Sequence, residues 1–163
     1  MQSIISNVKL FKFEKGGYFM NLNSKNETVG KLIELTINGK IKWSYLDSND
    51  SLCHELNLTP KKLLRNVSAS LAAYAAAKMN DKEEFDPDNS YYTRINSNYL
   101  VLFVKPATSN KEILAERLNL LLVPSSFRSV EIINDVDELV RLHTITKSGF
   151  PSVESIINDI LKM

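Results

Sequence analysis

The stretch N98-Y-L-V-L-F-V-K105 decides the fold class. Every residue from Leu100 to Val104 is apolar, which is typical of a central strand that is covered on both faces. The preceding segment Tyr91–Ile95 is rich in residues that favour strands, and Asn96-Ser97 separates the two segments. The pattern predicts a hairpin whose second strand lies inside a sheet.

The N-terminal part also has hairpin patterns. Val8–Phe13 and Tyr18–Leu22 are β-prone segments on either side of Gly16-Gly17. Asn38-Gly39 is a strong turn pair, and the apolar residues around it alternate. These alternating residues are Ile33, Leu35 and Ile37 before the turn and Ile41, Trp43 and Tyr45 after it. Four antiparallel strands are therefore expected within residues 7–46.

A long alanine-rich helix is expected in the centre of the chain. Thr59-Pro60 has the residue types of an N-cap and a first helical position, and the helix should run to Met79 or Asn80. Its large apolar stripe comprises Leu63, Leu64, Val67, Leu71 and Tyr74. A second stripe, at spacing i, i+3, i+4, i+7 and i+8, comprises Ala69, Ala72, Ala73, Ala76 and Ala77. Such small side chains permit close approach of another helix, from this chain or a second one.

Three further helices are expected in the C-terminal half. Ser109-x-x-Glu112 is a capping box that predicts a helix over 110–122, and Phe127–Ile133 is the next expected strand. Asp135-x-x-Glu138 predicts a helix to about Ile145, and Ser152 a last helix to the terminus. In the last helix, Val153, Ile156, Ile157, Ile160 and Leu161 repeat the helical apolar spacing.

These elements predict one α+β domain over residues 1–163. We expect an antiparallel sheet of five to seven strands, with a hairpin-rich N-terminal half, packed against the long helix at 59–80. No internal repeat or low-complexity linker divides the chain.

Composition indicates an ordinary globular protein. The chain is 44% apolar and 24% charged, and its net charge of +1 gives no global attraction to nucleic acid or to an anionic membrane. One cysteine excludes an internal disulfide framework. The first residues lack an apolar core of signal-peptide length, and no uncharged run approaches the roughly 18 residues of a membrane span. These observations predict a cytoplasmic location.

Catalytic motifs are weak. Cys53 and His54 are adjacent, so on a helix they point about 100° apart and do not serve one centre by themselves. His143 could approach Cys53 through the fold, but it lies in register with the apolar residues Val136, Leu139 and Val140. A buried structural cysteine and a hydrogen-bonded histidine at the edge of the core are the favoured interpretations.

Cofactor and metal motifs are also lacking. The sequence contains neither a P-loop nor G-x-G-x-x-G, and two histidines with one cysteine disfavour structural zinc. Asp86, Asp88 and Ser90 have the spacing that begins an EF-hand loop. However, Tyr91 stands where that loop needs glycine, and Ser97 where it needs glutamate. We expect no cofactor, no metal and no catalytic residue of a familiar kind.

Nucleic-acid binding is the alternative. Residues 51–79 have the outline of a helix-turn-helix, with a turn at Leu58-Thr59 and a second helix that opens with Lys61, Lys62 and Arg65. Few polar side chains follow Asn66, and this composition disfavours base readout.

The first functional hypothesis is therefore a non-catalytic binding protein that acts through protein contacts, such as an adaptor, an inhibitor or an immunity-type module. The alanine stripe is its predicted contact surface, and self-association is expected. A nucleic-acid-binding regulator and an enzyme with a dispersed active site are the second and third hypotheses.

Overall fold

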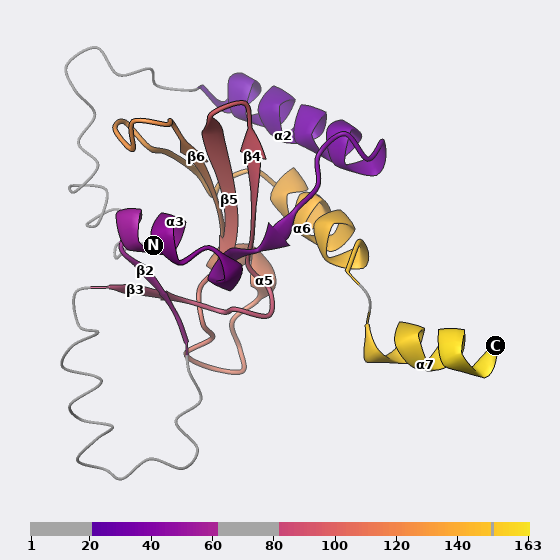
Figure 1. Ribbon diagram of the computed structural model, residues 1–163. Helices are drawn as coiled ribbons and strands as arrows, with labels where there is room; N and C mark the ends of the chain where they lie inside the picture. The colour runs from indigo at the N-terminus through magenta and orange to yellow at the C-terminus, as the bar shows by residue number, and fades with distance from the viewer. Residues whose placement is uncertain (1–20, 62–81, 151) are drawn as a thin grey trace, which may run out of the picture.

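The computed structural model describes residues 21–61, 82–150 and 152–163. Its centre is an antiparallel sheet with the strand order β1-β4-β5-β6-β7 (Figure 1). The strands are β1 (Ser44–Tyr45), β4 (Tyr91–Ile95), β5 (Asn98–Val104), β6 (Leu118–Val123) and β7 (Glu131–Ile133). The predicted hairpin is confirmed, since Tyr91 pairs with Leu102 and Ile95 with Asn98. β5 is the central strand, as its sequence predicts.

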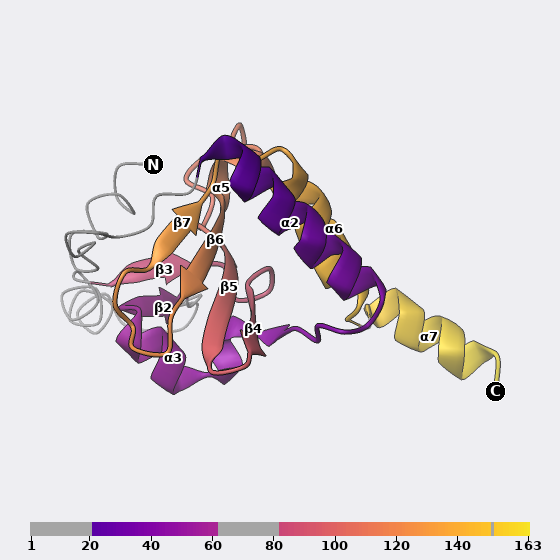
Figure 2. The ribbon, with the colours of Figure 1, turned by 90° about the horizontal axis from the view of Figure 1, so that it is seen from above.

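Two helices cover one face of this sheet. The helices α2 (Leu22–Ile37) and α6 (Glu138–Ser148) lie side by side across the strands (Figure 2). Alternate residues of β5 and β6 point toward them, as the two-residue period of a strand requires. The core on this face includes Val29, Leu32, Ile33, Leu100, Leu102, Val104, Leu118, Leu120, Leu139 and Leu142.

A smaller layer covers the opposite face. It contains the short 3-10 helix η2 (Leu46–Ser48), the helix α3 (Asp50–Glu55) and a parallel pair of strands, β2 (Leu58–Pro60) and β3 (Glu83–Phe85). The second core includes Leu46, Leu52, Cys53, Leu56, Phe85, Val101, Phe103, Leu121 and Val123. β5 is therefore buried from both sides, and the expected α+β class is confirmed.

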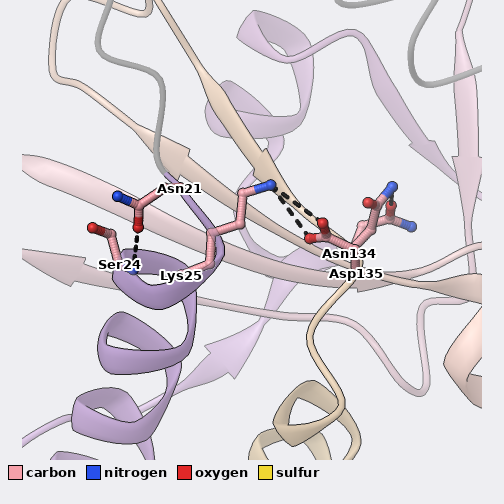
Figure 3. Close-up of polar contacts among 6 residues, drawn as sticks. Asn21, Ser24, Lys25, Asn134 and Asp135 are labelled. Atoms are coloured by element: carbon pink, nitrogen blue, oxygen red, sulfur yellow. Dashed lines mark hydrogen bonds and ion pairs between the residues drawn. The ribbon is translucent and has the colours of Figure 1, made fainter.

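An ion pair fastens α2 to the segment that leads into α6. The Nζ atom of Lys25 lies 3.4 Å from Oδ1 of Asp135. Figure 3 labels both residues and marks the contact with a dashed line. Nearby, the side chain of Asn21 accepts a hydrogen bond from the Ser24 amide and caps α2 (Figure 3). This one ion pair thus connects the first turn of α2 to the residues just before α6.

The hairpin expected around Asn38-Gly39 is wrong, and Leu22, the expected last residue of the strand Tyr18–Leu22, is instead the first residue of α2. Residues 22–37 form α2, and Asn38-Gly39 ends it. The Lys40 amide donates to the Leu35 carbonyl and the Gly39 amide to the Thr36 carbonyl, while Gly39 has φ of +70°. This is a Schellman motif, which needs the same positive φ that a hairpin turn needs.

The helix expected over 110–122 is also wrong for most of its length. Only α5 (Leu114–Arg117) is helical there, and Leu118–Val123 forms β6 between β5 and β7. The capping box does not start a helix, because Glu112 instead accepts hydrogen bonds from the amide and hydroxyl groups of Thr108. The apolar run of β6 is buried on both faces, as in a central strand.

The expected helix start at Thr59 is wrong, because Leu58–Pro60 is a strand paired with β3. The rest of that predicted helix lies outside the described residues, and so does the strand expected at Val8–Phe13. The first, short helix of the helix-turn-helix outline at 51–79 is confirmed as α3. The strand expected from Phe127 begins only at Glu131, since Phe127 and Ser129 both have a φ of +56°.

The two C-terminal helices are confirmed. α6 begins at Glu138, although no side chain caps it, and α7 (Val153–Leu161) begins after Ser152, whose hydroxyl accepts from the Ser155 amide. α7 extends away from the sheet and its two covering layers (Figures 1 and 2). None of the helices within 21–61, 82–150 and 152–163 combines the length and the apolar character needed to cross a bilayer.

Candidate binding site

A cleft lies beside α6, at the start of α7. Its volume is about 920 Å³, within the range of protein sites that hold ligand groups. An aromatic wall lines it, the cations Arg117 and Lys147 also reach it, and Asp88 is the one carboxylate among the described lining residues. The exposed residue Thr144 of α6 is a further part of the lining. The cleft therefore combines apolar surface with a positive balance of charge.

Three rings form the aromatic wall: Tyr45, Tyr91 and Phe150. The Phe150 ring centroid lies 4.5 Å from that of Tyr45 and 4.9 Å from that of Tyr91. Tyr91 is buried, its hydroxyl donates to the Asp88 carbonyl over 3.3 Å, and burial raises its pKa to about 12. Tyr91 is thus a neutral packing residue, and the wall fixes the position of Phe150 just before α7.

The loop at residues 86–90 is tied to α6 by two side chains. Nε2 of His143 lies 2.8 Å from the carbonyl oxygen of Asn89, and Nζ of Lys147 donates to Oδ1 of Asn89 over 2.6 Å. The Asn89 amide group in turn donates to Asp86 over 2.8 Å. The Asp86 carboxylate also accepts a hydrogen bond from the Asp88 amide, so both of its oxygens accept hydrogen bonds from within the loop. The acidic loop is closed by internal hydrogen bonds.

His143 and Cys53 do not form a catalytic pair. Cys53 belongs to the core on the α3 side of the sheet, whereas His143 lies on α6, which covers the other side. The Cys53 thiol donates to the Leu46 carbonyl, and its pKa is raised to about 11, first by burial and then by Asp50 and Asp47. The expected structural cysteine and the hydrogen-bonded core histidine are both confirmed.

The pKa of His143 is lowered, and burial is the main cause. The hydrogen bond to Asn89 and the negative charge of Asp86 raise this pKa, whereas the positive charges of Lys147 and Arg117 lower it further. Because a carbonyl oxygen only accepts, Nε2 carries the proton of the neutral ring. In the described ranges, no three side chains of His, Cys, Asp or Glu gather closely enough to hold a metal ion.

The exposed face of α7 is the second part of the candidate site. The large apolar residues of this helix are all exposed, up to 62% for Ile160 and 78% for Leu161. Placed at 100° intervals, the apolar residues from Val153 to Met163 span an arc of about 160°. Glu154 and Asp159 fall on the two borders of this arc, and Lys162 falls on the opposite side. The apolar face is thus flanked by carboxylates.

The structure reaches few of the predicted site residues. Lys61 is exposed, and its main-chain amide donates to the Phe85 carbonyl over 2.8 Å. Lys62 and Arg65 lie outside the described residues, as do Ala69, Ala72, Ala73, Ala76 and Ala77. The turn expected at Leu58-Thr59 belongs instead to β2. Nucleic-acid binding by this segment stays a prediction, as does partner binding by the alanine stripe.

Sequence reasoning missed the cleft, because its described lining residues come from five separate segments of the chain. The apolar periodicity of α7 was visible, but a stripe of that kind normally faces a core, so its exposure had no signal in the sequence.

No protein-family model, curated protein or solved structure matches this chain significantly.

Proposed function

We propose that this chain is a non-catalytic cytoplasmic binding protein that acts through protein contacts, with α7 as its main contact element. The observation that supports this proposal is the exposure of the whole apolar face of α7. Contiguous apolar patches of this kind on a soluble domain are characteristic of interaction surfaces. An adaptor, an inhibitor or an immunity-type module would use such an element.

The energetics favour a partner for this helix. A helix of nine residues is marginal in water by itself, because nucleation is costly and few hydrogen bonds repay it. Burying one Ile or Leu side chain contributes about 1.5–3 kcal/mol. Four such residues of α7, Ile156, Ile157, Ile160 and Leu161, would supply several kcal/mol on contact with a protein surface. Their burial would both stabilise the helix and support binding.

The chemistry of the described polar groups also supports binding over catalysis. Three of the described groups with altered pKa values are a buried thiol, a buried phenol and a buried imidazole, and each is hydrogen-bonded to a main-chain carbonyl. Burial favours the neutral form of all three. They are placed as packing groups rather than as a nucleophile, an acid and a base.

Site-specific crosslinking in the native cell tests the proposal. A photoreactive amino acid at position 160 lies in the apolar face of α7, and the same group at position 158 lies on the opposite, polar side as a matched control. We expect a crosslink to a polypeptide from position 160 and little from position 158. Equal labelling from both positions, or no protein product from 160, would refute the proposed function.

A further inference from the structure

We infer that α7 of one chain docks in the cleft of a second copy, and that the contact is reciprocal. This inference rests on the proposed function and names its partner. The cleft is the one defined above, with the wall of Tyr45, Tyr91 and Phe150 and with Arg117, Lys147 and Thr144 in its lining.

Charge complementarity is the first argument. The apolar face of α7 is bordered by the carboxylates of Glu154 and Asp159, so a fitting surface is apolar with cations near its rim. Among the described residues that line the cleft, the cations Arg117 and Lys147 outnumber the single carboxylate, Asp88, beside the aromatic wall. Opposite charges around an apolar contact select the partner and its orientation.

The place where α7 begins is the second argument. Phe150 is held by its ring contacts with Tyr45 and Tyr91, so the chain leaves the body at the edge of the cleft. Ser152, Val153 and Ser155 of the first turn line that edge, whereas Ile160 and Leu161 do not reach the lining. Figure 1 shows that α7 leads away from the sheet, and its distal apolar residues are exposed and available to another molecule.

Symmetry supplies the third argument. In a dimer with a twofold axis, a surface that contains both the helix and the cleft makes each contact twice. Two insertions bury twice the area of one, which matters because nine residues are a small contact by themselves. A short helix that is weak as a single ligand becomes sufficient in a closed pair.

Sedimentation equilibrium of the full chain, with matched variants, tests this contact. Thr144→Glu places a negative charge in the cleft, and Thr144→Lys places a positive one at the same exposed position of α6. Ile160→Glu alters the apolar face, and Asn158→Glu alters the polar side of the same helix. Circular dichroism confirms folding, and Leu161→Ser is a milder second variant of the face.

We expect a dimer whose dissociation constant rises at least tenfold in Thr144→Glu and in Ile160→Glu. Asn158→Glu should dimerise as the unaltered chain does, whereas Thr144→Lys should dimerise more tightly, because its charge is opposite to the charges of Glu154 and Asp159. Mixing Ile160→Glu with Thr144→Glu should give a heterodimer that is weaker than the unaltered dimer but tighter than the dimer of either variant, because one of its two contacts then joins an intact helix to an intact cleft.

The contrary results are specific. A chain that stays monomeric at all concentrations overturns the inference, and so does a dimer that is indifferent to Thr144→Glu. If α7 of one chain instead paired with α7 of the other, Thr144→Glu would still dimerise like the unaltered chain. Mixing it with Ile160→Glu would then give no heterodimer tighter than the Thr144→Glu dimer, which would also overturn the inference. A crosslink from position 160 to a different protein, with a monomeric chain, would overturn the second-copy inference while the proposed function stands.

Discussion

Nε2 of His143 donates a hydrogen bond to the main-chain carbonyl of Asn89 over 2.8 Å, which joins α6 to a loop 54 residues earlier in the chain. The imidazole is buried, and its pKa lies below the usual 6.5 chiefly for that reason. Folding therefore disfavours the protonated ring. Below about pH 6.5 the unfolded chain binds this proton more readily than the folded one, so stability falls as pH decreases through that window.

His143→Gln should reduce this pH dependence, because glutamine retains a donor but does not titrate. We expect the free energy of unfolding of the unaltered protein to decrease more steeply from pH 7.5 to 5.5 than that of the variant. Urea unfolding at several pH values measures both slopes, and His54 is common to both proteins. Parallel slopes would show that His143 titrates alike in the two states.

Ser90 supports the central strand from the loop that His143 holds. Ser90 is fully buried, and its hydroxyl oxygen accepts from the Val104 amide over 3.0 Å. Ser90→Ala should cost about 1–3 kcal/mol, because a buried amide loses its partner. Ser48→Ala is the control, since its exposed hydroxyl donates to the Tyr45 carbonyl and its loss should cost less. Chemical denaturation measures the free energy of unfolding of both variants, and equal decreases for Ser90→Ala and Ser48→Ala would contradict this account.

Two glycines of the α2 segment should respond oppositely to alanine. Gly30 lies within the helix and Gly39 has φ of +70°, and an added Cβ meets no atom within 4 Å at either position. Gly30→Ala should stabilise the fold by about 0.5–1 kcal/mol through helix propensity. Gly39→Ala should destabilise it by about 1 kcal/mol through backbone strain. Thermal unfolding midpoints that shift in the same direction would contradict the Schellman assignment.

Cys53 should be unreactive in the folded protein. Burial and the nearby Asp50 and Asp47 raise its pKa to about 11, so the thiolate is scarce at pH 8. We expect a thiol reagent to modify the one cysteine slowly in buffer and rapidly in denaturant. Fast modification of the folded chain would indicate an exposed, activated thiol.

The sequence was informative wherever one pattern had one structural meaning. The uninterrupted apolar run of β5 indicated a strand covered on both faces, and the Ser152 cap indicated the start of α7. Asn38-Gly39 misled because a Schellman motif and a hairpin turn share the same requirement for positive φ. The run from Leu118 misled because a short apolar segment fits a buried strand or a helix, and only pairing with β5 decides between them.

The candidate site was less accessible to sequence reasoning. The tertiary fold alone brings together the rings of Phe150, Tyr45 and Tyr91, and no spacing in the sequence predicts their contacts. The apolar stripe of α7 was recognised, but an interior position and an exposed one produce the same periodicity. Exposure is a property of the arrangement of elements, and so the contact helix emerged only from the structure.

Amide hydrogen exchange of residues 153–161 in the full chain, followed over a range of protein concentrations, tests the central claim most directly. An uncovered helix of this length should exchange rapidly, whereas docking on a second chain protects it. We predict protection that rises with concentration in the unaltered protein and is lost in Ile160→Glu. Protection that is already complete in the dilute monomer would show that α7 packs on its own chain, for example on the alanine positions 69–77, and would contradict the account.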